Sequence, residues 1–376
     1  MNNGGPRPGL ALALSGGGFR ATLFHLGALW RLNELGYLQK KKLTRVTSVS
    51  GGSIIAGVLG HRYNRLNFDG SGVAGNFVEE IATSLQSMCS RTIDVPSILS
   101  GWLSIFKTPS DLLDKRYRRY LFGKATLQDL PTDKEGPRFI IYATSFQTGA
   151  SVRFSKPYMA EYHLGQILDP EILLSTAVTA SSAFPPVLTP VIINLDPTAW
   201  QQTPGADLYH HVPLRAKMYL SDGGVYDNLG LEAAWNFETV LVSDAGAPFG
   251  IETNPVILKL SQVKKTLRVL DIAIDQTRAL RRRRVMEDYT NGTRKGTYWG
   301  IATKIDDYGL SDPMVKDNDR TRSMKRIHTR LCKFSEELKG YLINWGYALA
   351  DAAMRRWVLA PGAPKGSWPV PRYPLD

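Results

Sequence analysis

Short apolar runs alternate with stretches of helical apolar spacing near the start of the chain. The runs Leu10–Leu14 and Val46–Val49 predict two buried strands. Apolar residues three and four positions apart predict an amphipathic helix over Ala21–Leu35, and a second helix is predicted over Ser53–Tyr63. Glycines separate each strand from the helix that follows it. This repeated order of strand, glycine turn and helix is typical of a parallel sheet in an α/β fold.

The alternation is interrupted by two long segments. Residues from about 64 to 135, which include the aromatic stretch GWLSIFKTP, are helical and irregular in pattern and form a candidate cap over the sheet. Residues from about 262 to 345 are mainly helical and basic. Five prolines in residues 361–376 predict an extended tail.

Further strands are predicted between and after these segments. They lie at residues 138–145, 152–154, 218–220 and 239–243, and a helix is predicted at 229–237. We therefore expect one α/β domain over residues 8–360, with a helical insertion and a basic helical C-terminal extension.

The composition is that of an ordinary globular protein. Of 376 residues, 43% are hydrophobic and 21% are charged, which allows a sizeable core. No run of about 18 apolar residues occurs, and the start MNNGGPRPG lacks the apolar core of a signal peptide, so we expect a cytoplasmic protein. Cys89 and Cys332 are isolated and no histidines have HxxxH spacing, so we expect reduced cysteines, no metal and no other cofactor.

The net charge is strongly positive and unevenly distributed. The chain carries a formal charge of +12, and residues 262–334 contain 18 Lys and Arg against 9 Asp and Glu. A basic balance of this kind favours anionic partners, such as phospholipid surfaces, nucleic acids or nucleotides.

The glycine loop SGGGFRA, residues 15–21, follows a strand and opens a helix. Gly16, Gly18 and Ala21 match the dinucleotide pattern GxGxxG/A, but the region GYLQKKKLTRVTS lacks the acidic residue that a Rossmann unit places after its second strand. The same loop could direct backbone N–H groups at an oxyanion instead. A tight turn without a ligand is the third interpretation.

The stretch VTSVSGGS, residues 46–53, ends a strand on a serine followed by two glycines. A nucleophile elbow has this form, because the sharp turn requires small residues around an exposed serine. Ser50 would stand at the apex, with Ser48 two positions before it and Gly51 and Gly52 after it. Ser48 occupies a position that is usually glycine. The alternative is a plain Gly-Gly turn.

A serine nucleophile needs a base. None of the histidines follows a strand end in a glycine-rich turn, so we interpret them as structural or surface residues. Asp222 follows an apolar strand and precedes Gly223-Gly224, a position where α/β sheets place functional residues. Asp227 and Asp244 are rivals of the same type, and an ordinary Asp-Gly turn is the alternative.

Together these segments resemble the patatin-like phospholipases. The resemblance covers Leu10 to Gly246 and rests on SGGGFR, SVSGGS, SDGGVYDN and the intervening TASSAFPPV at Thr179–Val187. It implies a three-layer α/β/α fold with a central, mostly parallel sheet, and a phospholipase that acts on membrane phospholipid. It also implies residue roles: Ser50 as nucleophile, Asp222 as base, and an oxyanion hole formed by Gly16, Gly17 and Gly18, with Arg20 fixing the loop.

The patatin resemblance does not account for the basic extension. Arg278, Arg281, Arg282 and Arg284 lie on a helix predicted over Asp271–Asp288, where they could form a solvated face, an anionic-lipid site or a nucleotide site. The layout looks like the bacterial phospholipase effectors of anti-phage defence. That likeness implies activation by a cyclic di- or trinucleotide, homo-oligomers on activation, and peripheral binding at the inner face of the membrane. No DNA or RNA polymer is expected as a partner.

Two other functions remain open from the sequence. A catalytically silent patatin scaffold could bind nucleotide or lipid without cleaving an ester, although the presence of both Ser50 and Asp222 argues against it. An NAD(P)-binding oxidoreductase rests on the glycine loop alone.

Overall fold

The computed structural model describes residues 5–93, 108–251, 253 and 262–376. The stretch GWLSIFKTP, which the sequence analysis assigned to a cap, lies outside the described residues up to Lys107.

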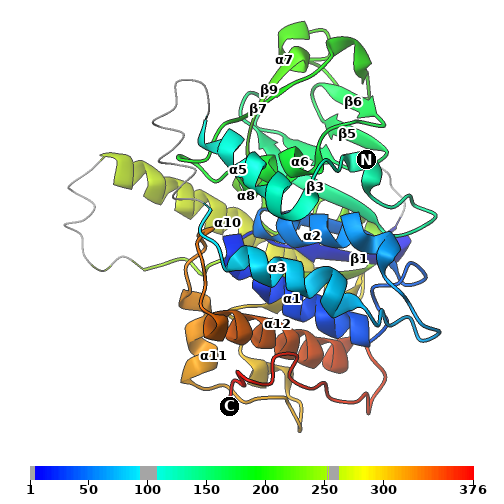
Figure 1. Ribbon diagram of the computed structural model, residues 1–376, viewed down its shortest axis with the longest axis vertical. Helices are drawn as coiled ribbons and strands as arrows, with labels where there is room; N and C mark the ends of the chain where they lie inside the picture. The colour runs from blue at the N-terminus through cyan, green and yellow to red at the C-terminus, as the bar shows by residue number, and fades with distance from the viewer. Residues whose placement is uncertain (1–4, 94–107, 252, 254–261) are drawn as a thin grey trace.

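Within the described residues, a mixed sheet of 11 strands runs from the centre of the molecule to the top of the view in Figure 1. Its parallel part comprises, in order, β11 (Lys295–Gly300), β10 (Phe237–Asp244), β1 (Arg7–Leu14), β2 (Leu43–Val49) and β3 (Arg138–Ser145). An antiparallel part continues from β3 through β4 (Ser151–Phe154), β5 (Tyr158–Glu161), β6 (Gly165–Leu168) and β8 (Trp200–Gln201). In addition, β9 (Lys217–Asp222) pairs antiparallel with β3 and with β7 (Val191–Asn194).

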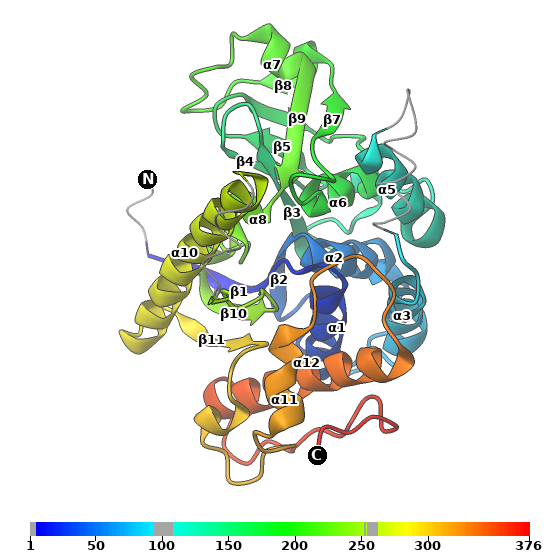
Figure 2. The same ribbon diagram turned by 90° about the vertical axis from the view of Figure 1, so that its left-hand side faces the viewer.

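Helices cover both faces of the parallel strands. One face carries α1 (Gly18–Glu34), α2 (Gly51–Arg62) and α12 (Glu336–Trp357), and α10 (Gln262–Thr290) lies across the sheet from them (Figure 2). Leu12 and Leu14 of β1 face the core under α1, whereas Ala11 and Ala13 face the cluster that contains Val285 of α10. This alternation along one strand follows from the two-residue period of β-structure. The predicted α/β class with three layers is confirmed.

The predicted amphipathic helix near the N-terminus is buried almost all round. Fifteen of the residues of α1 are buried because α12, which is more than 300 residues away in sequence, packs along its outer face. The two helices approach each other closely at two glycines. A Cβ on Gly27 would stand 1.8 Å from the carbonyl oxygen of Ile343, and one on Gly346 would stand 1.8 Å from that of Phe24.

We expect Gly27→Ala to lower the free energy of unfolding by about 3 kcal/mol, since a methyl group there must push two backbones apart. Denaturant titration measures the change. Gly75→Ala is the matched control, because a Cβ on Gly75 meets no atom within 4 Å. Equal stability of the two variants would contradict the close helix packing.

The described parts of the insertion join the helical layer. There α3 (Thr83–Cys89) packs against α1, and α5 (Pro109–Tyr117) packs against α6 (Leu174–Ser182). The proline-rich tail is extended and lies along α12: the side chain amide of Asn344 donates to the carbonyl oxygens of Val370 and Tyr373. The shorter helices are α7 (Val212–Ala216), α8 (Gly224–Asp227) and α11 (Asp319–Ser323).

One predicted helix is wrong, and one strand of the C-terminal extension was not predicted. Residues 229–237 form turns and a 3-10 turn at Ala234–Asn236 rather than a helix, because Leu229, Leu231 and Ala234 pack flat against the sheet. The C-terminal extension also contributes β11, which pairs with β10 and buries Trp299 completely. A six-residue strand inside a basic, helical segment has too short a pattern to stand out.

Candidate active site

Ser50 occupies the sharp turn between β2 and α2. Its backbone has φ 52° and ψ −121°, a conformation that non-glycine residues rarely adopt. The neighbouring glycines are needed for space: a Cβ on Gly51 would lie 2.0 Å from the carbonyl oxygen of Gly18, and one on Gly52 would lie 2.5 Å from that of Leu14. The serine at position 48 is accommodated, since its hydroxyl accepts a hydrogen bond from Ser53 at 3.0 Å.

The end of α6 supports this turn and the aspartate together. Ser50 N–H donates to the Ser181 hydroxyl at 2.9 Å, and Gly223 N–H donates to the Ser181 carbonyl at 3.2 Å. Asp222 N–H donates to the carbonyl of Ala183 at 3.0 Å. The sequence analysis noted the TASSAFPPV stretch but assigned no role to Ser181, whose function in positioning becomes visible only in the fold.

Strand register brings Asp222 beside Ser50. Asp222 pairs with Ala143 of β3, and the preceding residue of β3, Tyr142, pairs with Val49. The carboxyl group is buried: Oδ1 accepts from Gly224 N–H at 2.7 Å, whereas Oδ2 has no hydrogen-bond partner in the described part of the chain. Burial raises the pKa of Asp222 to about 7, opposed by the Gly224 N–H and by the nearby Ser50 hydroxyl.

The rival aspartates are occupied elsewhere. Asp244 accepts from Arg278 at 2.7 Å and from the Tyr298 hydroxyl at 2.6 Å; burial favours a high pKa, but Arg278 holds the pKa of Asp244 below its usual value. Asp227 accepts from two backbone N–H groups of the loop that follows it, at 3.0 and 2.8 Å. Of the three candidates, Asp222 therefore has the carboxylate oxygen that is available to take a proton.

The histidines contribute no base to this site. His25 lies inside α1, where its Nε2–H donates to the carbonyl of Ser15 at 2.9 Å and its Nδ1 accepts from the Ser243 hydroxyl at 2.8 Å. Burial lowers the pKa of His25 to about 4, so the ring is neutral and ties the ends of β1 and β10 together.

The glycine loop presents two backbone N–H groups beside Ser50. Gly17 and Gly18 have φ values of 142° and 58°, and their N–H groups donate to no acceptor among the described residues. Gly16 differs from the prediction, because its N–H donates to the backbone carbonyl of Asn228 at 3.0 Å. Its role is spacing: a Cβ there would lie 3.1 Å from that of Ser50.

Arg20 is buried behind this loop. Its guanidinium donates to the carbonyl oxygens of Ala245 at 2.5 Å and Ile327 at 2.7 Å. Burial, together with Arg278, lowers the pKa of Arg20 to about 10, which leaves it charged near neutral pH. The C-terminal extension is thereby tied to the start of α1, and a Cβ on Gly18 would stand 1.8 Å from the carbonyl of Thr329.

These groups share one cavity of about 440 Å³. Ser50, Asp222 and the glycine loop line it, and its walls come from three further segments. These segments are residues 184–188 after α6, residues 246–250 after β10, and residues 329–331, with α10 adding Arg268, Ile274 and Arg278. The sequence analysis did not assign α10 or residues 329–331 to this site.

Comparison with known proteins identifies the family. The patatin-like phospholipase family matches residues 12–235, more than half of the chain. The chain belongs to the patatin-like phospholipases. The matched residues include Ser50, Asp222 and the glycine loop, whereas β10, α10 and the C-terminal extension lie beyond them.

Solved structures that match this chain include human GIVD cytosolic phospholipase A2, with a TM-score of 0.49, 11% identity, and coverage of 92% of this chain and 61% of that one. VipD from Legionella pneumophila has a TM-score of 0.37, 16% identity, and coverage of 92% of this chain and 66% of that one. This patatin-like chain thus spans less than two thirds of the length of either structure. No curated protein matches its sequence.

The four arginines proposed as an anion site have different environments in this patatin-like protein. Arg278 is buried and donates to Asp244 and to the carbonyls of Gly246 and Ala247, so it braces the cavity wall from inside instead of forming an exposed site. Arg281 pairs with Asp227 at 3.3 Å, and Arg284 pairs with Asp288 at 3.4 Å. Arg282 is exposed.

The raised pKa of Asp222 predicts a pH dependence for any reaction in which it acts as a base. We expect kcat/KM to rise with pH and to level off above about 7, because only the ionised carboxylate accepts a proton. A pH profile with a soluble ester measures this. A profile without an inflection near this value would contradict the assignment of Asp222 as the base.

Proposed function

We propose that this protein is a serine lipid acyl hydrolase that cleaves acyl esters of membrane phospholipid through Ser50 and Asp222. The observation that carries the proposal is a serine in a strained turn beside a buried aspartate whose pKa is raised to about 7. Two neighbouring backbone N–H groups are available at the same cavity. Serine, base and oxyanion donors are the groups that acyl transfer requires.

The reaction follows from these positions. Asp222 takes the proton of Ser50 as Oγ attacks the acyl carbonyl carbon, and the N–H groups of Gly17 and Gly18 stabilise the resulting oxyanion. Asp222 returns the proton to the lysophospholipid alcohol as it leaves, which produces an acyl-enzyme. Water, deprotonated by Asp222, then releases the fatty acid and restores Ser50. Loss of one oxyanion donor typically costs about 3 kcal/mol.

The cavity walls favour a lipid substrate. Phe184, Val187 and Leu188 are apolar residues of the cavity that also contains the serine. A volume of about 440 Å³ lies within the usual range of ligand pockets and has room for part of an acyl chain. No described helix is long and apolar enough to cross a bilayer.

The test is release of fatty acid from phospholipid vesicles by the purified protein, with Ser50→Ala as the control. Release by the wild type alone supports the hydrolase. A failure of the wild type to cleave both vesicle lipid and a soluble ester would support the silent scaffold. Binding to immobilised NAD(P) tests the oxidoreductase, which the packing of the glycine loop against Ser50 disfavours.

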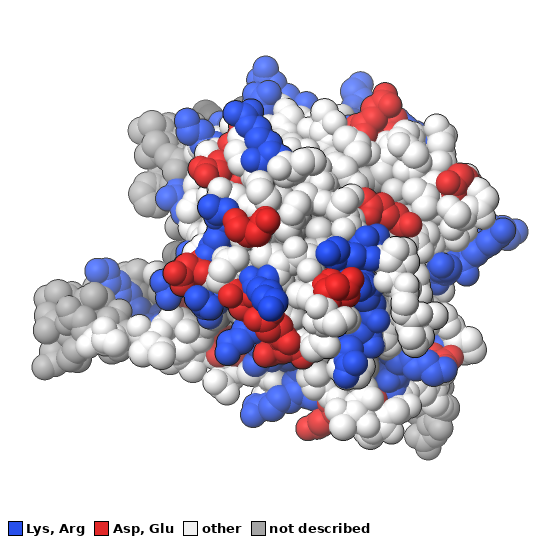
Figure 3. All heavy atoms as spheres, turned by 90° about the horizontal axis from the view of Figure 1, so that it is seen from below, with Lys and Arg blue, Asp and Glu red and all other residues white. Residues whose placement is uncertain are grey.

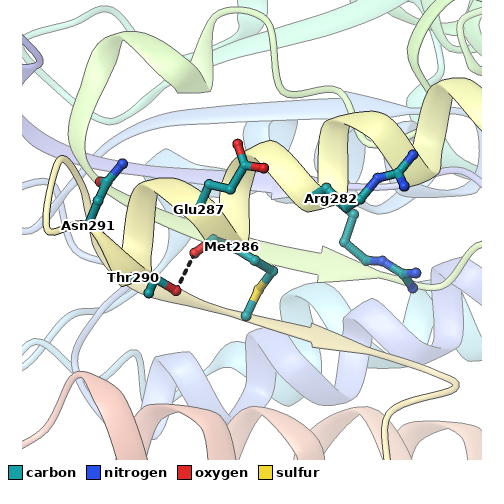
Figure 4. A pocket seen from close by; sticks show the side chains of 6 residues that line it. Arg282, Met286, Glu287, Thr290 and Asn291 are labelled. Carbon is teal, nitrogen blue, oxygen red and sulfur yellow. Dashed lines mark hydrogen bonds between the residues drawn. The ribbon is translucent and has the colours of Figure 1, made fainter.

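We also propose a regulatory site for a cyclic di- or trinucleotide on α10. A hollow of about 530 Å³ on this helix is lined by Arg282, Arg283, Met286, Glu287, Thr290 and Asn291 (Figure 4). Two guanidinium groups can pair with phosphates, and the amide of Asn291 can bond to a base. The Thr290 hydroxyl already donates to the Met286 carbonyl at 2.8 Å.

The charge around the C-terminal elements is mixed and not uniformly basic. On the face seen in Figure 3, Lys and Arg side chains lie beside Asp and Glu side chains. This arrangement disfavours a nucleic-acid polymer, which would need an extended basic surface. A panel of cyclic nucleotides in the vesicle assay, with size-exclusion chromatography, tests activation and homo-oligomer formation together. If the protein releases the same amount of fatty acid with each nucleotide as without it, the hydrolase proposal stands and the proposal of nucleotide regulation fails.

A further inference from the structure

Exposed apolar side chains from three separate segments lie in or next to the lining of the cavity. Phe184, after α6, and Phe249, in the loop after β10, line the cavity, whereas Ile251 and Ile272 directly follow the lining residues Gly250 and Asp271. Their exposed fractions are 43%, 38%, 87% and 43%, respectively. Isolated exposed apolar residues are common, but several gathered around one opening indicate a binding surface.

Basic groups accompany these side chains. The Arg268 guanidinium lies 3.9 Å from the centre of the Phe249 ring and donates to the carbonyl of Gly250 at 2.7 Å. The first fourteen residues of α10 hold Lys264, Lys265 and Arg268 against two acids, Asp271 and Asp275, which both line the cavity. Apolar side chains next to a net positive charge match the interface of an anionic bilayer, where acyl chains lie beneath phosphate groups.

From this arrangement we infer that the rim of the cavity, defined by Phe184, Phe249, Ile251 and Ile272, is the surface that docks on an anionic lipid bilayer. The inference rests on the proposed lipid hydrolase and names the face that meets the membrane. Docking there places the cavity opening against the headgroups, so that an acyl ester passes from the bilayer to Ser50 without crossing water. The exposed arginines farther along α10 then remain available for a different ligand.

The test uses Ile251→Asp combined with Ile272→Asp, because neither residue lines the cavity and both side chains are exposed. In a Ser50→Ala background, flotation with vesicles of phosphatidylglycerol and phosphatidylcholine in equal parts measures binding without hydrolysis. We expect the rim variant to bind these vesicles about tenfold more weakly. The parent is expected to bind phosphatidylcholine vesicles less than the mixed vesicles, and to lose binding as salt increases.

Trp357→Asp is the matched control, since Trp357 is 62% exposed at the end of α12, away from the cavity lining. It is expected to bind as the parent does. The inference would be overturned if the rim variant bound vesicles as well as the parent does. It would also be overturned if binding were lost in the double variant Arg282→Ser, Arg283→Ser and not in the rim variant.

A second readout separates this inference from the proposed function. In the active enzyme, the rim variant is expected to cleave a soluble short-chain ester at the wild-type rate while releasing less fatty acid from vesicles. If the wild type cleaves no ester, the hydrolase fails, and the flotation results still decide whether the rim binds lipid. Equal loss on soluble ester and on vesicles would overturn the inference by showing damage to the site itself.

Discussion

Replacing Ser50 by alanine is expected to lower kcat/KM for ester hydrolysis by about 10⁴-fold or more, because no acyl-enzyme can form. The turn itself should persist: alanine keeps the Cβ, and the supporting bond runs from the Ser50 backbone N–H to Ser181. Thermal unfolding is therefore expected to change little. Hydrolysis of a soluble ester measures the loss.

Two comparisons make this result specific. Ser87→Ala alters an exposed serine on α3 and is expected to leave both activity and stability unchanged. Ser50→Ala combined with Asp222→Asn is expected to lose no more activity than Ser50→Ala alone, since the two groups act as one unit. A Ser50→Ala protein that keeps most of its activity would assign the nucleophile to another residue.

Asp222→Asn is expected to have opposite effects on activity and stability. Asparagine is close in shape but accepts no proton, so we expect kcat to fall by about 10³-fold or more. The free energy of unfolding, in contrast, is expected to increase. The folded-state pKa of Asp222 is about 7 against an ordinary value of 3.8, so the folded protein binds an extra proton between these pH values.

The sign of the pH effect follows from this proton. A group that binds its proton more tightly in the folded state makes the protein less stable as pH rises through that interval, and the penalty is complete above the folded pKa. For Asp222 the upper limit is roughly 4 kcal/mol. Asp222→Asn is expected to remove this penalty and to be more stable than the wild type above about pH 7.

Denaturant titrations of both proteins, below and above that pH, measure the effect. Asp244→Asn is the matched control, because Asp244 is also buried but pairs with Arg278, which holds the pKa of Asp244 below its usual value. It is expected to be less stable than the wild type at neutral pH, which is the opposite sign. A stability difference between Asp222→Asn and the wild type that does not depend on pH would contradict the raised pKa.

The candidate site illustrates what local sequence can encode. A strand that ends on a serine followed by glycines needs those small residues when the chain turns sharply at the serine. Ser50 lies in such a sharp turn. Asp222 was favoured over its rivals from the Gly223-Gly224 that follow it. The structure supplies the reason in physical terms, because Gly224 N–H binds one carboxylate oxygen and leaves the other without a partner.

Other features depend on partners distant in sequence. Arg278 was grouped with exposed arginines, yet the fold places it on Asp244, 34 positions earlier, and inside the cavity wall. Gly16 was counted as an oxyanion donor, but Asn228 takes its N–H. Neither contact can be predicted from the spacing of neighbouring residues, because each joins residues that meet only after the sheet has assembled.

The sequence by itself determined the α/β class, the positions of the central strands along the chain, and the serine, aspartate and glycine loop as candidate site residues, since strand and helix periods and turn chemistry act over a few neighbouring residues. Only the tertiary structure decided that α12 would bury α1, that Ser181 would hold both halves of the site, and that α10 would form a cavity wall. Those contacts arise from packing and strand register between segments far apart in the chain. These contacts form because each buried backbone N–H and C=O group needs a hydrogen-bond partner, and each apolar face of a helix or sheet must pack against another element.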